Sequence, residues 1–153
     1  MKLKYGVTSF YDTNTGKPPR VKFETFKSLV YEVSHEISLK VIKIEEDGAA
    51  HNYYYACFIS EENFALVCNA HYPIIAFVRN FEKPYFGAQL VSEEAPSIST
   101  IVEQGQYFTY IGEDTLRESL QPEHCLELAE SEKIQIKKWD SKTLGEVIFN
   151  YYD

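Results

Sequence analysis

Cysteine is scarce in this chain: its 153 residues include three, Cys57, Cys68 and Cys125. An odd and small number does not give the even framework of a disulfide-stapled secreted domain, and two of the three lie in apolar stretches typical of strands. We therefore expect free, reduced thiols in a cytoplasmic protein. The opening residues, MKLKYGVTSFYD, lack the apolar core of a signal peptide, which agrees with that location.

Long apolar runs and phosphate-binding loops are also missing. No stretch approaches the roughly 20 apolar residues of a membrane-spanning helix. The glycines show none of the spacings that cradle a nucleotide phosphate. We expect neither a membrane protein nor a nucleotide-driven enzyme.

Metal-binding and nucleophilic patterns are weak. Cys68 and His71 form a single C-x-x-H pair, and on a strand their side chains would point to opposite faces. We therefore expect no metal and no cofactor. A nucleophilic pair of Cys57 or Cys68 with His51 or His71 stays open as an enzymatic alternative. The apolar neighbours of both cysteines favour inert packing, because an activated thiol needs a cation or a helix N-terminus beside it.

Apolar and aromatic residues are abundant, at 44% and 15% of the chain, which predicts one packed domain over residues 1–153. The richest stretch is 53–80, broken by the turn-prone Glu61-Glu62-Asn63, and it predicts two or three antiparallel strands. Alternate residues of 53–59 are apolar on both faces, which indicates a central strand. Pro73 cannot donate to a ladder, so it belongs at a strand start or an edge.

Periodicity predicts the remaining elements. Apolar residues at steps of three and four indicate a helix over 23–37. We expect strands at 3–10, 39–45 and 86–91, a short helix from Pro96 to Gly105, and an extended piece at 107–111. Asp114 is suited to cap a helix over 115–120, followed by a second helix over 123–131 and a short strand containing Ile134 and Ile136. Thr143 and Glu146 have the spacing of a capping box that opens a terminal helix.

Together these elements predict an α+β fold. An antiparallel β-sheet of about five strands would pack with an N-terminal helix and several C-terminal helices, because strands and helices do not alternate as they do in βαβ units.

The charge is strongly acidic: 23 carboxylates against 15 Lys and Arg give a net charge of −8. Such a surface repels nucleic acid and anionic lipid, so we expect no direct nucleic-acid partner and no membrane partner. A basic protein is the natural complement.

Most of this charge lies in residues 113–132, where seven carboxylates stand against Arg117. Glu123, Glu127 and Glu130 would share one face of a helix, with His124 exposed beside them. The segment is either a solvated helix face or a docking surface for a basic protein. The candidate contact residues are Glu113, Asp114, Glu118, Glu123, Glu127 and Glu130, with the tyrosine cluster Tyr53, Tyr54 and Tyr55 as a second surface.

The end of the chain carries a resemblance. Trp139 followed by TLGEVIFNYYD at 143–153 resembles the tail of small bacterial proteins, several of which are immunity proteins of polymorphic or contact-dependent toxin systems. The resemblance covers this tail alone and brings no catalytic residue. It implies a non-enzymatic cytoplasmic protein that neutralises a cognate toxin domain by tight binding. Because many such toxins are nucleases with basic clefts, the acidic segment would be the contact.

Two other functions remain open. One is a small cytosolic hydrolase built on the Cys/His pair. The other is a ligand-binding domain with its pocket between the sheet and the helix at 23–37.

Overall fold

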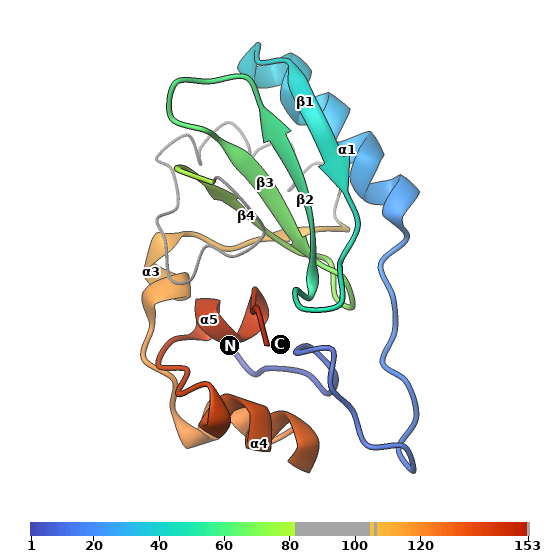
Figure 1. Cartoon of the computed structure of the whole chain (residues 1–153), viewed down its shortest axis with the longest axis vertical. Helices are drawn as coiled ribbons and strands as arrows, with labels where there is room; N and C mark the ends of the chain where they lie inside the picture. The colour runs from blue at the N-terminus through green and yellow to red at the C-terminus, as the bar shows by residue number, and fades with distance from the viewer. Residues whose placement is uncertain (82–104, 106, 153) are drawn as a thin grey trace.

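The structure, a computed structural model, describes residues 1–81, 105 and 107–152. Its elements lie around one β-sheet, with a long helix beside the sheet and short helices at the other end of the molecule (Figure 1). In chain order they are α1 (Phe23–Ile37), β1 (Val41–Glu45), β2 (Tyr53–Phe58), β3 (Ala65–Asn69), β4 (Ile74–Val78), β5 (Thr109–Tyr110), α3 (Glu113–Arg117), the 3₁₀ turn η1 (Pro122–Cys125), α4 (Glu130–Lys138) and α5 (Leu144–Ile148).

Helix α1 has the bounds that the apolar stripe predicts. Phe26, Leu29, Val30 and Val33 are buried against the sheet, at the three- and four-residue steps that place side chains on one helical face. The helix ends at Ser38, whose left-handed backbone (φ 56°) turns its N–H back onto the carbonyl of His35.

The sheet has the order β1-β2-β3-β4-β5. Strands β1 to β4 form an antiparallel meander, and the two-residue β5 joins β4 in parallel. Strands β2 and β3 are buried on both faces, which the alternating apolar rows of 53–59 predict for β2. Pro73 immediately precedes β4, where it need not donate to the ladder. The predicted α+β fold is therefore confirmed.

Each face of the sheet carries its own core. Phe26, Val30 and Val33 of α1 cover the face that presents Tyr54, Phe58 and other buried side chains. The opposite face packs against the N-terminal segment, α3 and α5. Helices α3 and α5 approach closely at Gly145, where a β-carbon would lie 2.8 Å from the Leu116 carbonyl oxygen.

Three predicted elements are wrong. Residues 3–10 form turns rather than a strand, with Gly6 and Ser9 at positive φ, and their backbone is bonded by a distant side chain instead of a ladder. The helix expected over 123–131 is the short η1 followed by a turn. Helix α4 then takes in Ile134 and Ile136, which were expected in a strand.

A smaller difference concerns the start of α3. Gly112, not Asp114, precedes α3, so Asp114 lies in the first helical turn. The strand expected at 86–91 and the helix expected from Pro96 lie outside the described residues. Within the described part of the chain, no helix combines the length and apolar composition needed to cross a bilayer.

Candidate functional site

The acidic segment runs along one side of the molecule, from α3 down to α4 (Figure 1). Five of its carboxylates are exposed, namely Asp114, Glu118, Glu123, Glu127 and Glu130. Glu113 is partly buried and pairs with Arg117 at 2.9 Å, and Glu130 pairs with Lys133 at 3.3 Å. The segment therefore presents less free charge than its composition indicates.

The expected common helix face does not form. Glu123 lies on η1, Glu127 lies in the following turn, and Glu130 is the first residue of α4. Part of the acidity has a structural cause, because carboxylates in the first turn of a helix interact favourably with its dipole. Glu113 and Asp114 occupy that turn in α3, and Glu130 and Glu132 occupy it in α4.

The carboxylates that lie outside these two helix starts form a surface around η1, and folding does not explain their charge. Leu126 is 65% exposed between Glu123 and Glu127. Glu118 joins the same surface, because its carboxylate lies 3.4 Å from His124 Nε2 on η1. We call Glu118, Glu123, Leu126 and Glu127 the acidic ridge. An exposed leucine among carboxylates is suited to contact with a protein that offers both cations and apolar surface.

His124 is buried, not exposed as its acidic context suggested. The N–H of Gln121 donates to its Nδ1 at 2.9 Å, so the ring proton resides on Nε2 and points at Glu118. The carbonyl of His124 also accepts the N–H of Leu3 at 2.9 Å. This histidine fixes the base of the ridge to the N-terminal segment.

The prediction that the tyrosine cluster forms a second interface is wrong. Tyr53, Tyr54 and Tyr55 are 1%, 1% and 4% exposed, so none can anchor a partner on this surface. The Tyr54 hydroxyl donates to the carbonyl of Val21 at 2.6 Å, which explains a polar tip in the core. Burial also raises the pKa of Tyr53 above its usual range.

The cysteines have the properties of packed side chains. Cys68 is completely buried, and burial raises the pKa of its thiol well above the ordinary value. Burial likewise raises the pKa of Cys57 and Cys125. An activated nucleophile needs the opposite shift. In the described part of the chain, no three His, Cys, Asp or Glu side chains gather as a metal site.

His71 pairs with a residue that sequence reasoning missed. Its Nε2 lies 2.7 Å from Ser9 Oγ, and its Nδ1 lies 2.9 Å from the carbonyl oxygen of Pro19. Nδ1 therefore donates to Pro19 and Nε2 accepts the Ser9 hydroxyl. A serine–histidine pair could act as nucleophile and base. However, the N–H groups of Ser9 and Phe10 already donate to Gly6 and Thr8, so these two amides are not available to stabilise an oxyanion.

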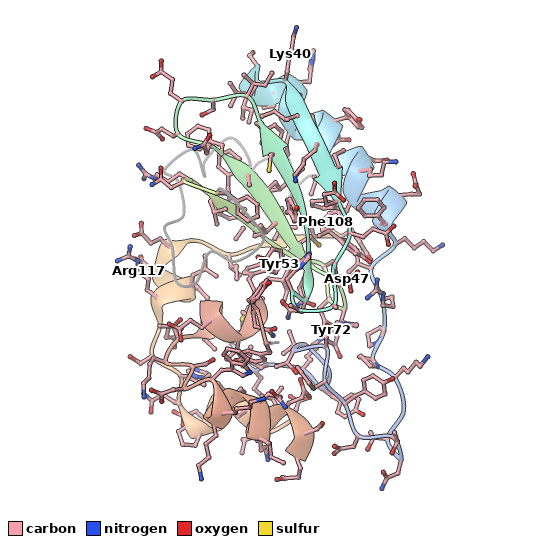
Figure 2. The ribbon with its side chains drawn as sticks, viewed as in Figure 1. Lys40, Asp47, Tyr53, Tyr72, Phe108 and Arg117 are labelled. Carbon is pink, nitrogen blue, oxygen red and sulfur yellow. The ribbon has the colours of Figure 1, made fainter. Side chains whose placement is uncertain are left out.

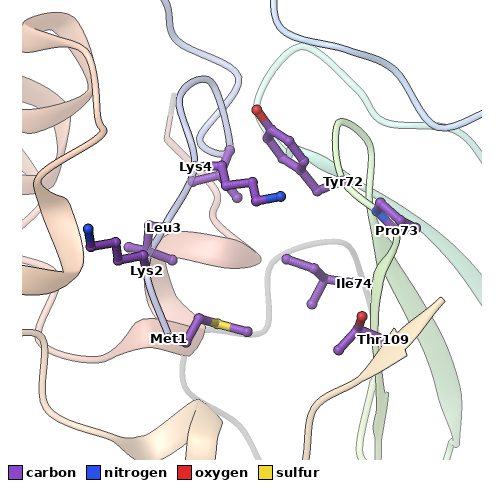
Figure 3. Close-up of a pocket in the computed structure, with 9 residues that line it drawn as sticks. Met1, Lys2, Leu3, Lys4, Tyr72, Pro73, Ile74 and Thr109 are labelled. Carbon is purple, nitrogen blue, oxygen red and sulfur yellow. The ribbon is translucent and has the colours of Figure 1, made fainter. Parts of the chain in front are cut away.

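The described surface has hollows, and two of them bear on ligand binding. One is a cavity of about 220 Å³ between the N-terminal segment and the loop before β4 (Figure 3). Lys4 reaches across it, with Nζ 5.8 Å from the centre of the Tyr72 ring. It is smaller than the roughly 300–1,000 Å³ of typical ligand pockets. The other is an open groove between α1 and β1 at the sheet edge. The space expected to hold a ligand between α1 and the sheet is filled by core side chains such as Phe26 and Val30.

The chain matches no protein-family model, no curated protein and no solved structure. Its function therefore has to follow from the chemistry of these surfaces.

Proposed function

We propose that this chain is a non-enzymatic, cytoplasmic immunity protein of a bacterial toxin system, which binds a cognate basic toxin domain and neutralises it through the acidic ridge. The observation that carries the proposal is the exposure of Leu126 among Glu118, Glu123 and Glu127. The tail at 139–153, which resembles that of immunity proteins, supports the same function.

The physics of the ridge suits a basic partner. Among the described residues, no Lys or Arg forms an ion pair with Glu118, Glu123 or Glu127. Their field, on a chain whose net charge is −8, would speed the approach of a cationic surface and repel an anionic one. Leu126 would supply the apolar contact that slows dissociation once the ion pairs have set the orientation.

The test is protection of cells from a toxin. A bacterial host would express the toxin domain encoded beside this gene, together with either the unmodified chain or the triple variant Glu118→Lys, Glu123→Lys, Glu127→Lys. The unmodified chain should restore growth. Reversing three charges should slow association with the purified toxin by about tenfold or more at low salt.

The matched control is the triple variant Glu24→Lys, Glu32→Lys, Glu36→Lys, which makes the same charge change on the exposed face of α1. It should retain protection and change the association rate far less. Equal rates for the two triple variants would remove the ridge from the function. Failure of the unmodified chain to bind or protect against that toxin domain would refute the immunity function itself.

A further inference from the structure

Strand β1 ends the sheet on the side of α1 (Figure 1). In the described part of the chain it pairs with β2 alone. The N–H of Ile59 donates to the Lys40 carbonyl at 2.8 Å, whereas the N–H of Phe58 donates away from β1, to Phe64. Odd-numbered residues of β2 therefore face β1.

The direction of the free backbone groups follows from this register. Lys43 and Glu45 lie opposite Cys57 and Tyr55, so they make the hydrogen bonds to β2. The N–H and carbonyl of Ile44, between them, point away from β2 to the open edge. Such groups can accept a further strand.

Apolar side chains accompany this edge. Tyr31 on α1 and Ile42 on β1 are 59% and 61% exposed. Both line the groove beside the strand, together with Lys27, Ser34, Lys40, Val41, Lys43 and Ile44. A strand added to β1 would border this groove.

The order of charges along β1 identifies what would fit. Lys40 immediately precedes the strand and Lys43 is its middle residue, whereas Glu45 ends the strand and Glu46 follows it, and all four are exposed. Figure 2 shows Lys40, just before the strand, at one end of the sheet and Asp47, two residues after the strand, near the other. An acidic peptide would meet the two glutamates and a basic peptide the two lysines. A second copy of β1 in the opposite direction places each sign against its complement.

We propose that two copies of the chain pair through β1 in an antiparallel arrangement, with Ile44 facing Ile44 of the second copy on a two-fold axis. Lys43 of each copy then lies opposite Glu45 of the other, on one face of the joined sheet. A register centred on Lys43 would instead place Lys43 opposite Lys43 of the second copy, so that two positive charges would face each other. The β-bulge between Val41 and Lys43 ends where the three pairing residues begin, and the register from Lys43 to Glu45 is regular. The acidic ridge takes no part, so the dimer does not depend on the proposed function.

The first experiment is sedimentation velocity of the purified chain over a hundredfold range of concentration. The unmodified chain should pass from monomer to dimer. Lys43→Glu and Glu45→Lys should each weaken self-association by about tenfold or more, because each sets like charges opposite at two symmetric positions. An equimolar mixture of these two variants should form a heterodimer, since every carboxylate at position 43 or 45 would then face an ammonium group of the other copy.

The matched control is the pair Glu36→Lys and Lys137→Glu, which makes the same charge changes on the helices. Each should self-associate like the unmodified chain, and an equimolar mixture should associate no more strongly than either variant alone. A chain that stays monomeric at the highest concentration would overturn the proposal. A dimer that both Lys43→Glu and Glu45→Lys leave intact would also overturn it, because another face would then be responsible.

Amide hydrogen exchange tests the register without any substitution. In the dimer the Ile44 N–H is bonded to the second copy, so its exchange should slow as concentration rises. The amides of Lys43 and Glu45, which belong to the β1–β2 ladder, should be protected at every concentration. Fast exchange at Ile44 in a sample that is dimeric by sedimentation would exclude this pairing. Protection of Ile44 by an added oligoglutamate peptide, without self-association, would assign the edge to an acidic strand instead.

Discussion

The carboxylate of Glu132 accepts the backbone N–H of Gly6 at 2.7 Å, although the two residues lie 126 positions apart in the chain. It also accepts the N–H and the hydroxyl of Thr8, at 3.1 and 2.7 Å, and the N–H of Ala129 at 3.0 Å. Glu132 is fully buried. Its charge is held by four donors rather than by a cation, and α4 is thereby fixed to the N-terminal turn.

Replacing Glu132 by Ala should destabilise the protein strongly. The substitution leaves four buried donors without their acceptor, so the free energy of unfolding should fall by about 3–5 kcal/mol. Urea denaturation measures this loss. Glu130→Ala, two positions away on the same helix but exposed, should change stability by less than about 0.5 kcal/mol. Equal midpoints for the two variants would contradict the anchoring role of Glu132.

Gly6 and Gly16 offer a second matched pair. Both have positive φ, at 82° and 92°, but a β-carbon on Gly6 would lie 2.2 Å from Pro18 Cβ, whereas one on Gly16 would meet nothing within 4 Å. Gly16→Ala should therefore lower the free energy of unfolding by only about 1 kcal/mol, the cost of a left-handed backbone at alanine. Gly6→Ala should lower it by about 1–3 kcal/mol more, because Pro18 must move. Calorimetric melting of both variants checks this, and equal melting temperatures would show that Pro18 yields without cost.

Local periodicity was enough to predict the central elements. The steps between Phe26, Val30 and Val33 define a helical face, and the aromatic run at 53–58 defines a buried strand, because each pattern fits one backbone period. The Thr143 hydroxyl does accept the N–H of Glu146, at 3.2 Å, as the capping box predicts. However, the Glu146 carboxylate bonds the N–H of Lys142 instead of that of Thr143.

Long-range contacts explain where the sequence misled. The alternation of Ile134 and Ile136 indicates a strand, but the acidic start of α4 and the anchored Glu132 favour a helix there. Tyr53 to Tyr55 carry polar tips in any environment, so composition could not distinguish a core from an interface. The charge of the candidate site was readable from the sequence. The burial of Glu132 and the exposure of Leu126 were not, because both depend on residues far away in the chain.

The thiols should react slowly in the native protein, and Cys68 should not react at all without unfolding. Cys68 is completely buried, so alkylation there should require global unfolding. Cys57 and Cys125 should react more slowly than an unstructured thiol, because burial raises the pKa of each and lowers its thiolate fraction near neutral pH. Timed labelling with iodoacetamide and mass spectrometry measures all three. The urea-unfolded chain is the control. A thiol that is alkylated faster in the native protein than in the unfolded chain would favour the Cys/His hydrolase.

Ionic strength should separate the two parts of the acidic ridge. Association of the toxin domain with the unmodified chain should slow as salt rises, because the charges of Glu118, Glu123 and Glu127 act at long range. Leu126→Ala should leave that salt dependence and the association rate unchanged but speed dissociation, since an apolar contact forms only after docking. Stopped-flow and surface plasmon resonance give the two rates. A Leu126→Ala variant that dissociates like the unmodified chain would place the apolar contact elsewhere.

His71 should make stability depend on pH in the mildly acidic range. Burial lowers its pKa in the folded state below the ordinary value of 6.5, and the nearby charge of Arg20 lowers it further. The hydrogen bond to the Pro19 carbonyl and the charges of Asp47 and Glu132 act in the opposite direction but do not cancel the effect of burial. As pH falls below 6.5, the unfolded chain binds a proton at this position while the folded protein does not. The free energy of unfolding should therefore decrease as pH decreases, by up to about 1.4 kcal/mol per pH unit, until the folded His71 is protonated as well.

Urea denaturation across this range tests the contribution of that single ring. His71→Gln keeps a polar side chain beside Ser9 but cannot titrate, so its stability should be lower at neutral pH and should decline less steeply as pH falls. His35→Gln is the matched control, because His35 is exposed on α1 and its loss should leave the slope unchanged. If the slope survives in His71→Gln, the neutral ring bonded to Ser9 and Pro19 is not the group that titrates. The N-terminal turn would then be held equally well by a protonated histidine.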